Sequence, residues 1–215
     1  MSAAPPAPPA AHEAFSTGFG LAVRFAELLC TAGVERGLIG PREPERIWDR
    51  HLLGGAALGA FVPPGFEVTD LGSGAGLPGI PLAIARPDLR VTLVEPMQRR
   101  VRFLEEAVAM LGLPVTVRRA RAQELAPGSC QVLVARALAP LPELLTLALP
   151  LLRPGGQLLA VKGERAAAEL ADAGEILRSR PNVRVSLDSS GEGEHTVRVV
   201  RAVVSEREVE DRERA

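Results

Sequence analysis

A glycine-rich run, Asp70-Leu71-Gly72-Ser73-Gly74-Ala75-Gly76-Leu77-Pro78-Gly79, decides the fold class of this chain. The apolar stretch at 68–71 that leads into it predicts a short β-strand, and the apolar stretch at 80–85 predicts a short helix. Glycines let the backbone turn tightly and let a ligand approach it closely. The start of the following helix offers N–H groups that have no partner within the helix. The run therefore predicts a strand, a ligand-binding loop and a helix in succession.

Predicted strands and helices alternate along the rest of the chain. The strands lie at 68–71, 91–94, 115–117, 132–135, 158–161, 183–187 and 197–204. The helices after the loop lie at 80–85, 98–111, 141–149 and 165–177. Alternation of this kind is typical of an α/β fold whose mainly parallel sheet carries helices on both faces. We expect a Rossmann-like, seven-stranded sheet that binds its ligand at the carboxyl ends of the strands.

The two ends of the chain are expected to differ from this α/β domain. Residues 1–11 are rich in alanine and proline and predict a disordered tail, whereas 12–64 predict an N-terminal helical cap. Pro63-Pro64-Gly65 breaks the chain and marks the end of the cap. The ligand-binding domain is expected at 65–205, followed by a charged C-terminal tail at 206–215.

The composition limits the kinds of function that the chain can carry. The formal net charge is −1 and only 3% of the residues are aromatic, so neither a polycationic surface nor aromatic stacking platforms are expected. Cys30 and Cys130 lie far apart in apolar surroundings, which predicts reduced core thiols and no metal site. No apolar run approaches the roughly 20 residues of a membrane span, and the start does not resemble a secretory signal. We expect a cytoplasmic protein.

Two kinds of cofactor compete for the glycine loop. Gly74, Gly76 and Gly79 satisfy the dinucleotide pattern G-x-G-x-x-G, which alone is weak evidence. Asp70 and Gly72 complete a different pattern, D-x-G-x-G-x-G. A carboxylate at the loop entrance would repel a pyrophosphate, but it favours the sulfonium and ammonium groups of S-adenosylmethionine. The residues therefore favour S-adenosylmethionine, with Asp70, Gly72 and Gly74 as cofactor-binding residues.

Glu95 is predicted to bind the ribose of the cofactor. It ends the strand at 91–94, about twenty residues past the loop, where an acidic side chain can bind both ribose hydroxyls. This role is compatible with any cofactor that contains adenosine. The alternative is an ordinary solvated glutamate at a strand end.

Five segments of the chain together resemble one enzyme family. The glycine loop reads DLGSGAGLPGIPLAI, PREPERIWDRHLL precedes it, and RVRFLEEAVAMLGL follows Glu95. RAQEL comes after the third predicted strand, and VARALAPL is followed by RPGGQLLAVKG. This set resembles the bacterial small-subunit ribosomal RNA methyltransferases known as RsmG, formerly GidB, over about residues 38–163.

The resemblance implies a class I methyltransferase that uses S-adenosylmethionine to methylate N7 of a guanine in the 530 loop of 16S rRNA. It implies that Gly72 and Leu77 contact the cofactor and that Ala122 and Gln123 bracket its adenine. It also implies that Arg136 reaches the cofactor site from the end of the fourth predicted strand. The family often has an acidic residue in place of Gln123, so the chain departs from the family pattern at the adenine.

The implied chemistry needs no catalytic acid or base, and none is assigned. Guanine N7 has a lone pair and no proton, so its attack on a methyl group requires no deprotonation. Rate enhancement would come mainly from aligning N7, the methyl carbon and the sulfur.

Basic residues are the candidates for contact with RNA. Region 86–121 contains eight arginines and four acids, and with the resemblance it predicts a phosphate-binding patch rather than a merely solvated face. Arg136 and Lys162 end predicted strands, where either could hold a phosphate or a base edge. Lys162 could instead be an ordinary exposed lysine, and His51 a satisfied helix residue. The predicted RNA contacts are Arg42, His51, Arg99, Arg100, Arg136 and Lys162.

Three classes of function remain open at this point. The first is a methyltransferase acting on 16S rRNA or on the small ribosomal subunit, expected as a monomer. The second is a methyltransferase acting on a small molecule or a protein, because the fold does not choose the acceptor. The third is a non-catalytic nucleotide-binding module or a dinucleotide oxidoreductase. The 42–51 segment and the arginines of 86–121 favour the first class, and Asp70 weighs against the third.

Overall fold

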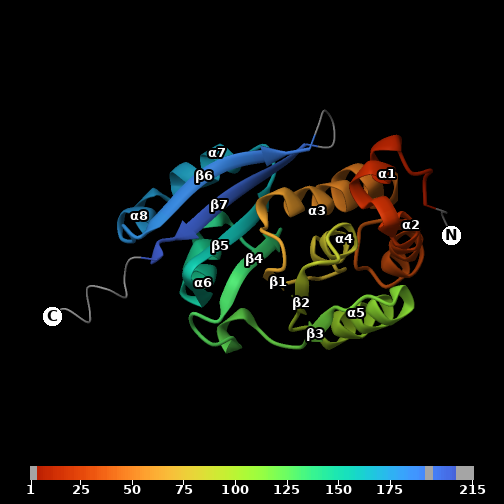
Figure 1. Cartoon of the computed structure of the whole chain (residues 1–215), viewed down its shortest axis with the longest axis horizontal. Coiled ribbons are helices and arrows are strands. Elements are labelled where there is room, and N and C mark those ends of the chain that lie inside the picture. The colour runs from red at the N-terminus through yellow and green to blue at the C-terminus, as the bar shows by residue number, and fades with distance from the viewer. Residues whose placement is uncertain (1–3, 192–195, 207–215) are drawn as a thin grey trace.

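Seven strands form one sheet in the computed structural model, which describes residues 4–191 and 196–206 (Figure 1). The predicted C-terminal tail therefore lies almost wholly outside the described residues. The strands are β1 (Glu67–Leu71), β2 (Arg90–Val94), β3 (Thr116–Arg118), β4 (Cys130–Arg136), β5 (Leu152–Lys162), β6 (Val183–Ser190) and β7 (Val197–Val204). Their spatial order is β3-β2-β1-β4-β5-β7-β6, with β1 to β5 parallel and β7 antiparallel to both of its neighbours. The prediction of a mainly parallel seven-stranded sheet is confirmed.

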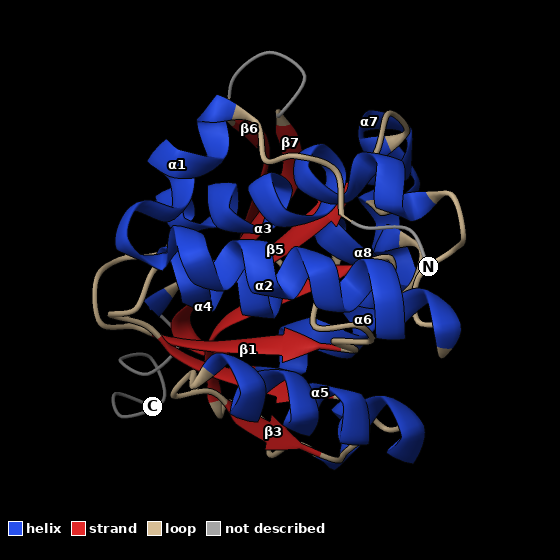
Figure 2. Ribbon diagram, turned by 90° about the vertical axis from the view of Figure 1, so that its right-hand side faces the viewer, coloured by secondary structure: helices blue, strands red, loops and turns tan. Residues whose placement is uncertain are grey.

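Helices cover both faces of this sheet (Figure 2). Those that follow the glycine loop are α4 (Gly79–Ala85), α5 (Gln98–Leu111), α6 (Leu141–Ala148), α7 (Ala166–Asp172) and α8 (Gly174–Arg178). The cap contributes α1 (Pro9–Phe15), α2 (Phe19–Leu28) and α3 (Gly54–Ala56), joined by short helical turns that include Glu43–Arg46 and Ile47–Leu53. The cap packs on the face that carries α4 and α5, while α6, α7 and α8 cover the other face.

Alternation along the central strands divides their apolar side chains between two cores. Val132 and Val134 of β4 belong to the core beneath the cap, α4 and α5. Leu133 and Ala135 of the same strand belong to the core beneath α6, α7 and α8. Because successive side chains of a strand point to opposite faces, a strand buried on both faces must be apolar throughout. This is why the central strands read as continuous apolar runs.

Residues 4–11, which belong to the segment expected to be a disordered tail, pack against the rest of the cap in the structure. Helix α1 begins at Pro9, and Ala11 is fully buried. Trp48 Nε1 donates a hydrogen bond of 2.9 Å to the carbonyl of Pro5. A buried indole N–H needs such an acceptor, and the extended segment before α1 supplies it. A composition typical of a linker therefore conceals a segment that packs against the cap.

Two further boundaries differ from the prediction. The strand predicted at 158–161 begins earlier, as β5 at Leu152, and a register shift against β4 accommodates the extra residues as a bulge. The helix expected at 165–177 is divided into α7 and α8 at Ala173. Both differences arise where the chain makes a local irregularity without leaving its element.

The fold gathers the carboxyl ends of β1, β2, β4 and β5 at one edge of the sheet, as expected for a ligand site. The cap turn Ile47–Leu53 reaches the same edge. Arg136, the last residue of β4, donates a hydrogen bond of 3.0 Å from Nη1 to the carbonyl of Arg50 in this turn. The cap is therefore part of the site and not only a cover for the sheet.

In residues 4–191 and 196–206, no helix is long and apolar enough to cross a membrane. No group of three or more histidine, cysteine, aspartate or glutamate side chains there could hold a metal ion.

Candidate active site

Asp70, near the end of β1, holds the start of α4. Its side chain is fully buried, and its Oδ2 accepts a hydrogen bond of 3.0 Å from the backbone N–H of Gly79. Burial raises the pKa of Asp70 to about 7, even though the hydrogen bond from Gly79 acts in the opposite direction. In a dinucleotide-binding fold, an N–H group at this helix start would meet the pyrophosphate. Here that donor is already satisfied by the protein.

Glu95, directly after β2, holds the opposite side of the glycine loop. Its Oε2 accepts a hydrogen bond of 3.0 Å from the backbone N–H of Gly74, and its Oε1 accepts one of 3.0 Å from Met97. The side chain is 1% exposed, and the Arg100 guanidinium lies 3.7 Å from Oε2. Each carboxylate oxygen has more than one acceptor position. The backbone bonds therefore orient Glu95 and leave it able to accept ribose hydroxyls.

The loop fits S-adenosylmethionine and does not fit a dinucleotide. Two loop N–H groups, those of Gly74 and Gly79, are bound to internal carboxylates, and Glu95 adds negative charge beside the loop. Asp70 thus disfavours a pyrophosphate by occupying a donor, and not by standing at the loop entrance as expected. Gly72 and Gly74 have φ values of +69° and +57°, which glycine adopts without strain. A cofactor with positive groups and no phosphate suits this arrangement.

Gly72 and Leu77, the loop residues implied by the resemblance, lie in different surroundings. A Cβ added to Gly72 would lie 2.6 Å from Cδ1 of Leu138, so Leu138 covers this part of the loop. The side chain of Leu77 is buried in the core beneath the cap. Gly72 therefore lies at the ligand edge, while the side chain of Leu77 supports the loop from behind.

A cavity of about 580 Å³ lies beyond Glu95 along the same edge. It is lined by Pro96, Met97, Arg119, Ala120, Arg121 and Glu124. Ala122 and Gln123 form a single helical turn, Ala122–Glu124, beside this cavity. Glu124 closes the turn by accepting a hydrogen bond of 2.7 Å from the N–H of Arg121. The loop, Glu95 and this cavity follow the order of the methionine, ribose and adenine parts of S-adenosylmethionine.

Arg136 is held by the cap through His51. Arg136 Nη2 lies against Nδ1 of His51, and Nε2 of His51 lies against Oε2 of Glu43. Because a guanidinium has only donors, Nδ1 must accept and the ring proton resides on Nε2, which donates to Glu43. Burial, aided by the charge of Arg136, lowers the pKa of His51 to about 4. Burial also lowers the pKa of Arg136 to about 10. His51 is therefore a neutral link between a cap carboxylate and the arginine.

This geometry does not favour His51 as a contact to RNA, the role expected from the sequence. The residue is 4% exposed and both of its ring nitrogens have partners within the protein. His51 lies behind Arg136, so an approaching RNA would meet the arginine first. The alternative that the sequence left open, a helix residue whose hydrogen bonds are made within the protein, describes His51 better.

Stability should depend on pH through His51. In the unfolded chain His51 takes up a proton near pH 6.5, whereas the folded protein resists protonation until about pH 4. Between these values the unfolded state binds more protons, so the free energy of unfolding should fall as the pH drops from 6.5 to 4. Urea unfolding at several pH values measures this. The loss should be smaller in His51→Gln and unchanged in His12→Gln, whose side chain is exposed. Equal losses in wild type and His51→Gln would show that His51 does not cause the effect.

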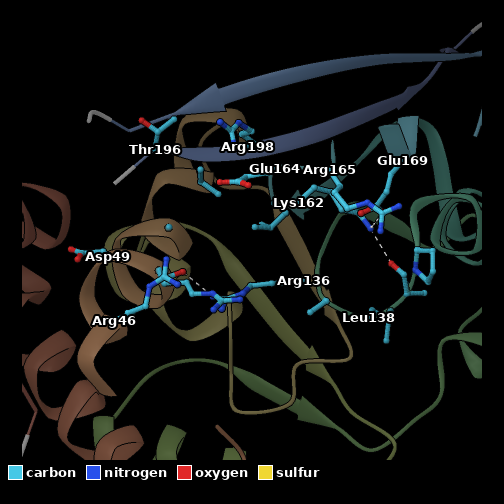
Figure 3. Close-up of a pocket in the computed structure, with 18 of the residues that line it drawn as sticks. Arg46, Asp49, Arg136, Leu138, Lys162, Glu164, Arg165, Glu169, Thr196 and Arg198 are labelled. Carbon is cyan, nitrogen blue, oxygen red and sulfur yellow. Dashed lines mark hydrogen bonds and ion pairs between the residues drawn. The ribbon is translucent and has the colours of Figure 1, made fainter. Parts of the chain in front are cut away.

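A larger cavity, about 970 Å³, opens beside Arg136 between the cap and strands β5 and β7 (Figure 3). The basic residues that line it are Arg46, Arg50, Arg136, Lys162, Arg165 and Arg198, and the acidic ones are Asp49, Glu164, Glu169 and Asp172. Arg50 pairs with Glu43 at 3.2 Å. Within the part of the chain that the structure describes, Arg46, Arg165 and Arg198 form no ion pair. Three guanidinium groups from separate segments therefore line this cavity without an ion-pair partner among residues 4–191 and 196–206.

Lys162, at the end of β5, is bound within the protein. Its Nζ lies 2.8 Å from Oε2 of Glu169 and donates a hydrogen bond of 2.9 Å to the carbonyl of Ala139. The hydrogen bond from Lys162 lowers the pKa of Glu169. The lysine side chain is only 8% exposed. It is therefore neither the ordinary exposed lysine nor the freely available phosphate ligand that the sequence suggested.

The arginines of 86–121 do not form one patch. Arg86 and Arg90 lie at the amino end of β2, away from the glycine loop, and pair with Asp88 and Glu67. Arg100 turns back toward the buried Glu95 and is only partly exposed. Counting the arginines of 86–121 together therefore gives too high a local positive charge. Strand and helix direct these side chains to different parts of the molecule.

Arg99 and Arg42, the remaining predicted RNA contacts, are exposed, and neither lines one of the two cavities.

Several residues of the site were not predicted from the sequence. They are Glu43, Arg46, Leu138, Arg165, Glu169 and Arg198. Glu43 and Arg46 belong to the PREPERIWDRHLL segment that carried part of the resemblance, which was the one available signal for them. Arg198 lies beyond the resembling segments, and nothing local distinguishes it from a solvated strand residue.

Comparison with known proteins identifies relatives over most of the chain. Residues 20–197 match the family model described as rRNA small subunit methyltransferase G, GidB. A Frankia casuarinae protein named ribosomal RNA small subunit methyltransferase G is 52% identical over 94% of this chain and 79% of its own length. A Streptomyces avermitilis protein of the same name is 54% identical over 88% of this chain and 81% of its own length.

Solved structures with low sequence identity share the fold. An Aquifex aeolicus SAM-dependent methyltransferase superimposes with a TM-score of 0.55 at 20% identity, covering 79% of this chain and 96% of its own. A Corynebacterium glutamicum protein gives a TM-score of 0.55 at 21% identity, covering 86% of this chain and 90% of its own. The Rossmann-like architecture is therefore common to all three proteins.

Proposed function

Because this chain belongs to the rRNA small subunit methyltransferase G family, we propose that it transfers a methyl group from S-adenosylmethionine to N7 of a guanine in 16S rRNA. The assignment of S-adenosylmethionine as the cofactor is supported by one observation. Internal carboxylates accept hydrogen bonds from the loop N–H groups of Gly74 and Gly79. The assignment of RNA as the methyl acceptor is supported by family membership and by the arginine-lined cavity beside Arg136. A guanine in the 530 loop is the acceptor implied by the family resemblance.

The residues of the chain would bind and align the reactants without moving a proton. Bound S-adenosylmethionine supplies a methyl group activated by a positively charged sulfur. Glu95 would orient the ribose, and Arg136 would stand where the glycine loop meets the larger cavity. Guanine N7 needs no deprotonation, so alignment is the main contribution to rate. Neither Asp70 nor His51 is placed to act as a base, since both are buried and bound within the protein.

The rate of methyl transfer should be nearly independent of pH. With RNA and cofactor saturating, single-turnover rates should vary by no more than about twofold between about pH 6.5 and 8.5, because arginine stays charged there. His51 stays neutral over this range because its pKa is about 4. Asp70, with a pKa of about 7, could add a weak inflection through the loop, which Asp70→Asn would remove. A steep rise that persists in Asp70→Asn would contradict a mechanism without a base.

The decisive experiment maps the methylated nucleotide. Unmodified 16S rRNA and small subunits assembled from it are incubated with the protein and S-adenosylmethionine, and nuclease fragments are analysed by mass spectrometry. We expect N7-methylguanosine at one guanine of the 530 loop, and the two substrates show whether free rRNA or the assembled subunit is the partner. Calorimetry should detect S-adenosylmethionine binding and no NAD binding. Tight NAD binding, or methylation only of proteins or small molecules, would overturn the proposal.

We further propose that the protein acts on RNA as a monomer and that RNA phosphates meet Arg46, Arg165 and Arg198. These arginines line one cavity, with Arg46 on the cap side and the other two on the side of α7 and β7 (Figure 3). Guanidinium groups bind phosphate in a planar, two-bond geometry. Arg99 and Arg42 would contribute only if the RNA extends beyond this cavity.

Removing two of these arginines should change the salt dependence of RNA binding. The double variant Arg46→Gln/Arg198→Gln should lower affinity for 16S rRNA and reduce the slope of log K against log salt by about 1.5, as for two lost phosphate contacts. Binding is measured by filter retention across a salt series. The matched control is Arg90→Gln, since Arg90 lies at the opposite edge of the sheet. A slope equal to that of wild type would show that the cavity arginines do not meet phosphates.

A further inference from the structure

The segment that follows β4 has an unusual conformation for its sequence. Ala137 has a φ of +51°, in the left-handed region that residues other than glycine rarely adopt. Leu138, next in the chain, is 38% exposed although it is apolar, and its side chain lies against Gly72 of the cofactor loop. Residues 137–140 also line the larger cavity. The segment therefore forms the boundary between the cofactor loop and the space open to an acceptor.

Two polar side chains, Lys162 and Glu169, bind the backbone of this segment. Lys162 Nζ donates to the carbonyl of Ala139 at 2.9 Å and lies 2.8 Å from Oε2 of Glu169. The same Oε2 accepts a hydrogen bond of 3.0 Å from the backbone N–H of Leu141. The carbonyl of Ala139 and the N–H of Leu141 are thus bound by one ion pair that joins β5 to α7.

We propose that Lys162 and Glu169 are positioning residues that set the 137–141 segment as the surface against which the acceptor nucleobase is placed, with Leu138 as its exposed contact. This inference rests on the proposed function. A left-handed alanine persists only where its surroundings impose it, and the two backbone bonds made by this pair act on the residues that follow Ala137. Apolar side chains could fill the same space without the cost of desolvating charges. The pair is therefore better explained by the geometry that it imposes than by stability.

The test replaces Lys162 with methionine, which has similar length and no donor. Single-turnover methyl transfer to 16S rRNA should slow by about tenfold or more, because small displacements of an aligned acceptor reduce rate strongly. The dissociation constant of S-adenosylmethionine should stay within about twofold, since neither residue touches Glu95 or the glycine loop. Lys162→Arg, which keeps donors for both partners, should recover most of the rate.

Hydrogen exchange gives a readout that does not depend on activity. The Leu141 amide and its neighbours in 137–141 should exchange faster in Lys162→Met than in wild type. Arg90→Met is the matched control, because it removes an ion pair with Glu67 at the opposite edge of the sheet. It should leave both rate and exchange in 137–141 unchanged. If Lys162→Met does not fold, Glu169→Met provides the comparison, because it removes the acceptor that binds the Leu141 N–H and the partner of Lys162.

The outcomes separate this inference from the proposed function. A wild-type protein that binds S-adenosylmethionine but does not methylate 16S rRNA would refute the proposed function, and with it the acceptor role of the segment. Methylation by wild type with an unchanged rate in folded Lys162→Met would refute the positioning role alone. A loss of thermal stability with rate and exchange intact would likewise mean that the pair is only structural. Slower transfer, faster local exchange and unchanged cofactor affinity together would support the inference.

Discussion

Replacing Glu95 with alanine is expected to lower the affinity for S-adenosylmethionine by at least about 100-fold. A charged acceptor contributes about 1.5–3 kcal/mol to each hydrogen bond that it makes, and two ribose hydroxyls would be lost. The variant would also free the N–H groups of Gly74 and Met97, which the carboxylate now orients. Calorimetry measures the loss, and thermal unfolding in the absence of cofactor shows whether the variant is folded.

Two further variants separate the possible causes. Glu105→Ala removes an exposed carboxylate from α5, the helix that follows Glu95, and should leave cofactor affinity unchanged. Glu95→Gln keeps an oxygen acceptor without the charge, so its loss should be smaller than that of Glu95→Ala. If folded Glu95→Ala binds the cofactor as tightly as wild type, Glu95 serves only to shape the loop.

Replacing Gly79 with alanine is expected to destabilise the fold by roughly 2–6 kcal/mol. The added Cβ would collide with Cδ2 of Leu93 and would lie 2.6 Å from Oδ2 of Asp70. Overpacking a core typically costs about 1–3 kcal/mol. Pushing Asp70 away would leave a buried carboxyl without its backbone donor, which costs about another 1–3 kcal/mol. Such a loss is a large share of the roughly 5–15 kcal/mol that stabilises a typical domain.

Gly20→Ala is the matched control for this substitution. Gly20 lies within α2, and a Cβ there would meet nothing within 4 Å. Alanine in an open helical position should stabilise the protein by about 0.5–1 kcal/mol, because glycine is the poorer helix former. Urea unfolding compares both variants with wild type. Equal stability of Gly79→Ala and wild type would mean that α4 can shift away from β1 at little cost.

Local patterns were sufficient to predict the α/β fold and the position of the cofactor loop. Strand burial, helix periodicity and the glycines of 70–79 each depend on a few neighbouring residues. The position of Glu95 beside the loop was predicted in the same way, because the end of the second strand must lie beside the loop in a parallel sheet. Arg136 was placed at the same edge by resemblance, at the end of the fourth strand.

Interactions between distant segments were beyond such reasoning. The extended chain before α1 looks like a linker, yet it supplies an acceptor for Trp48, 43 residues away. The region 86–121 carries many arginines, yet the fold directs them to opposite edges of the sheet. Local composition does not record where a side chain points once helices and strands pack.

The sequence by itself determined that the glycine loop at 70–79 and Glu95 lie next to each other at one edge of the sheet. It did so because glycine conformation and strand periodicity are local properties. Only the tertiary structure decided which charged groups are available to a ligand. From the sequence, His51 and Lys162 could contact a ligand. In the structure, Glu43 and Glu169 bind them within the protein. The reason is that the state of a charge depends on burial and on partners within a few ångströms. Those partners are brought together by the path of the whole chain.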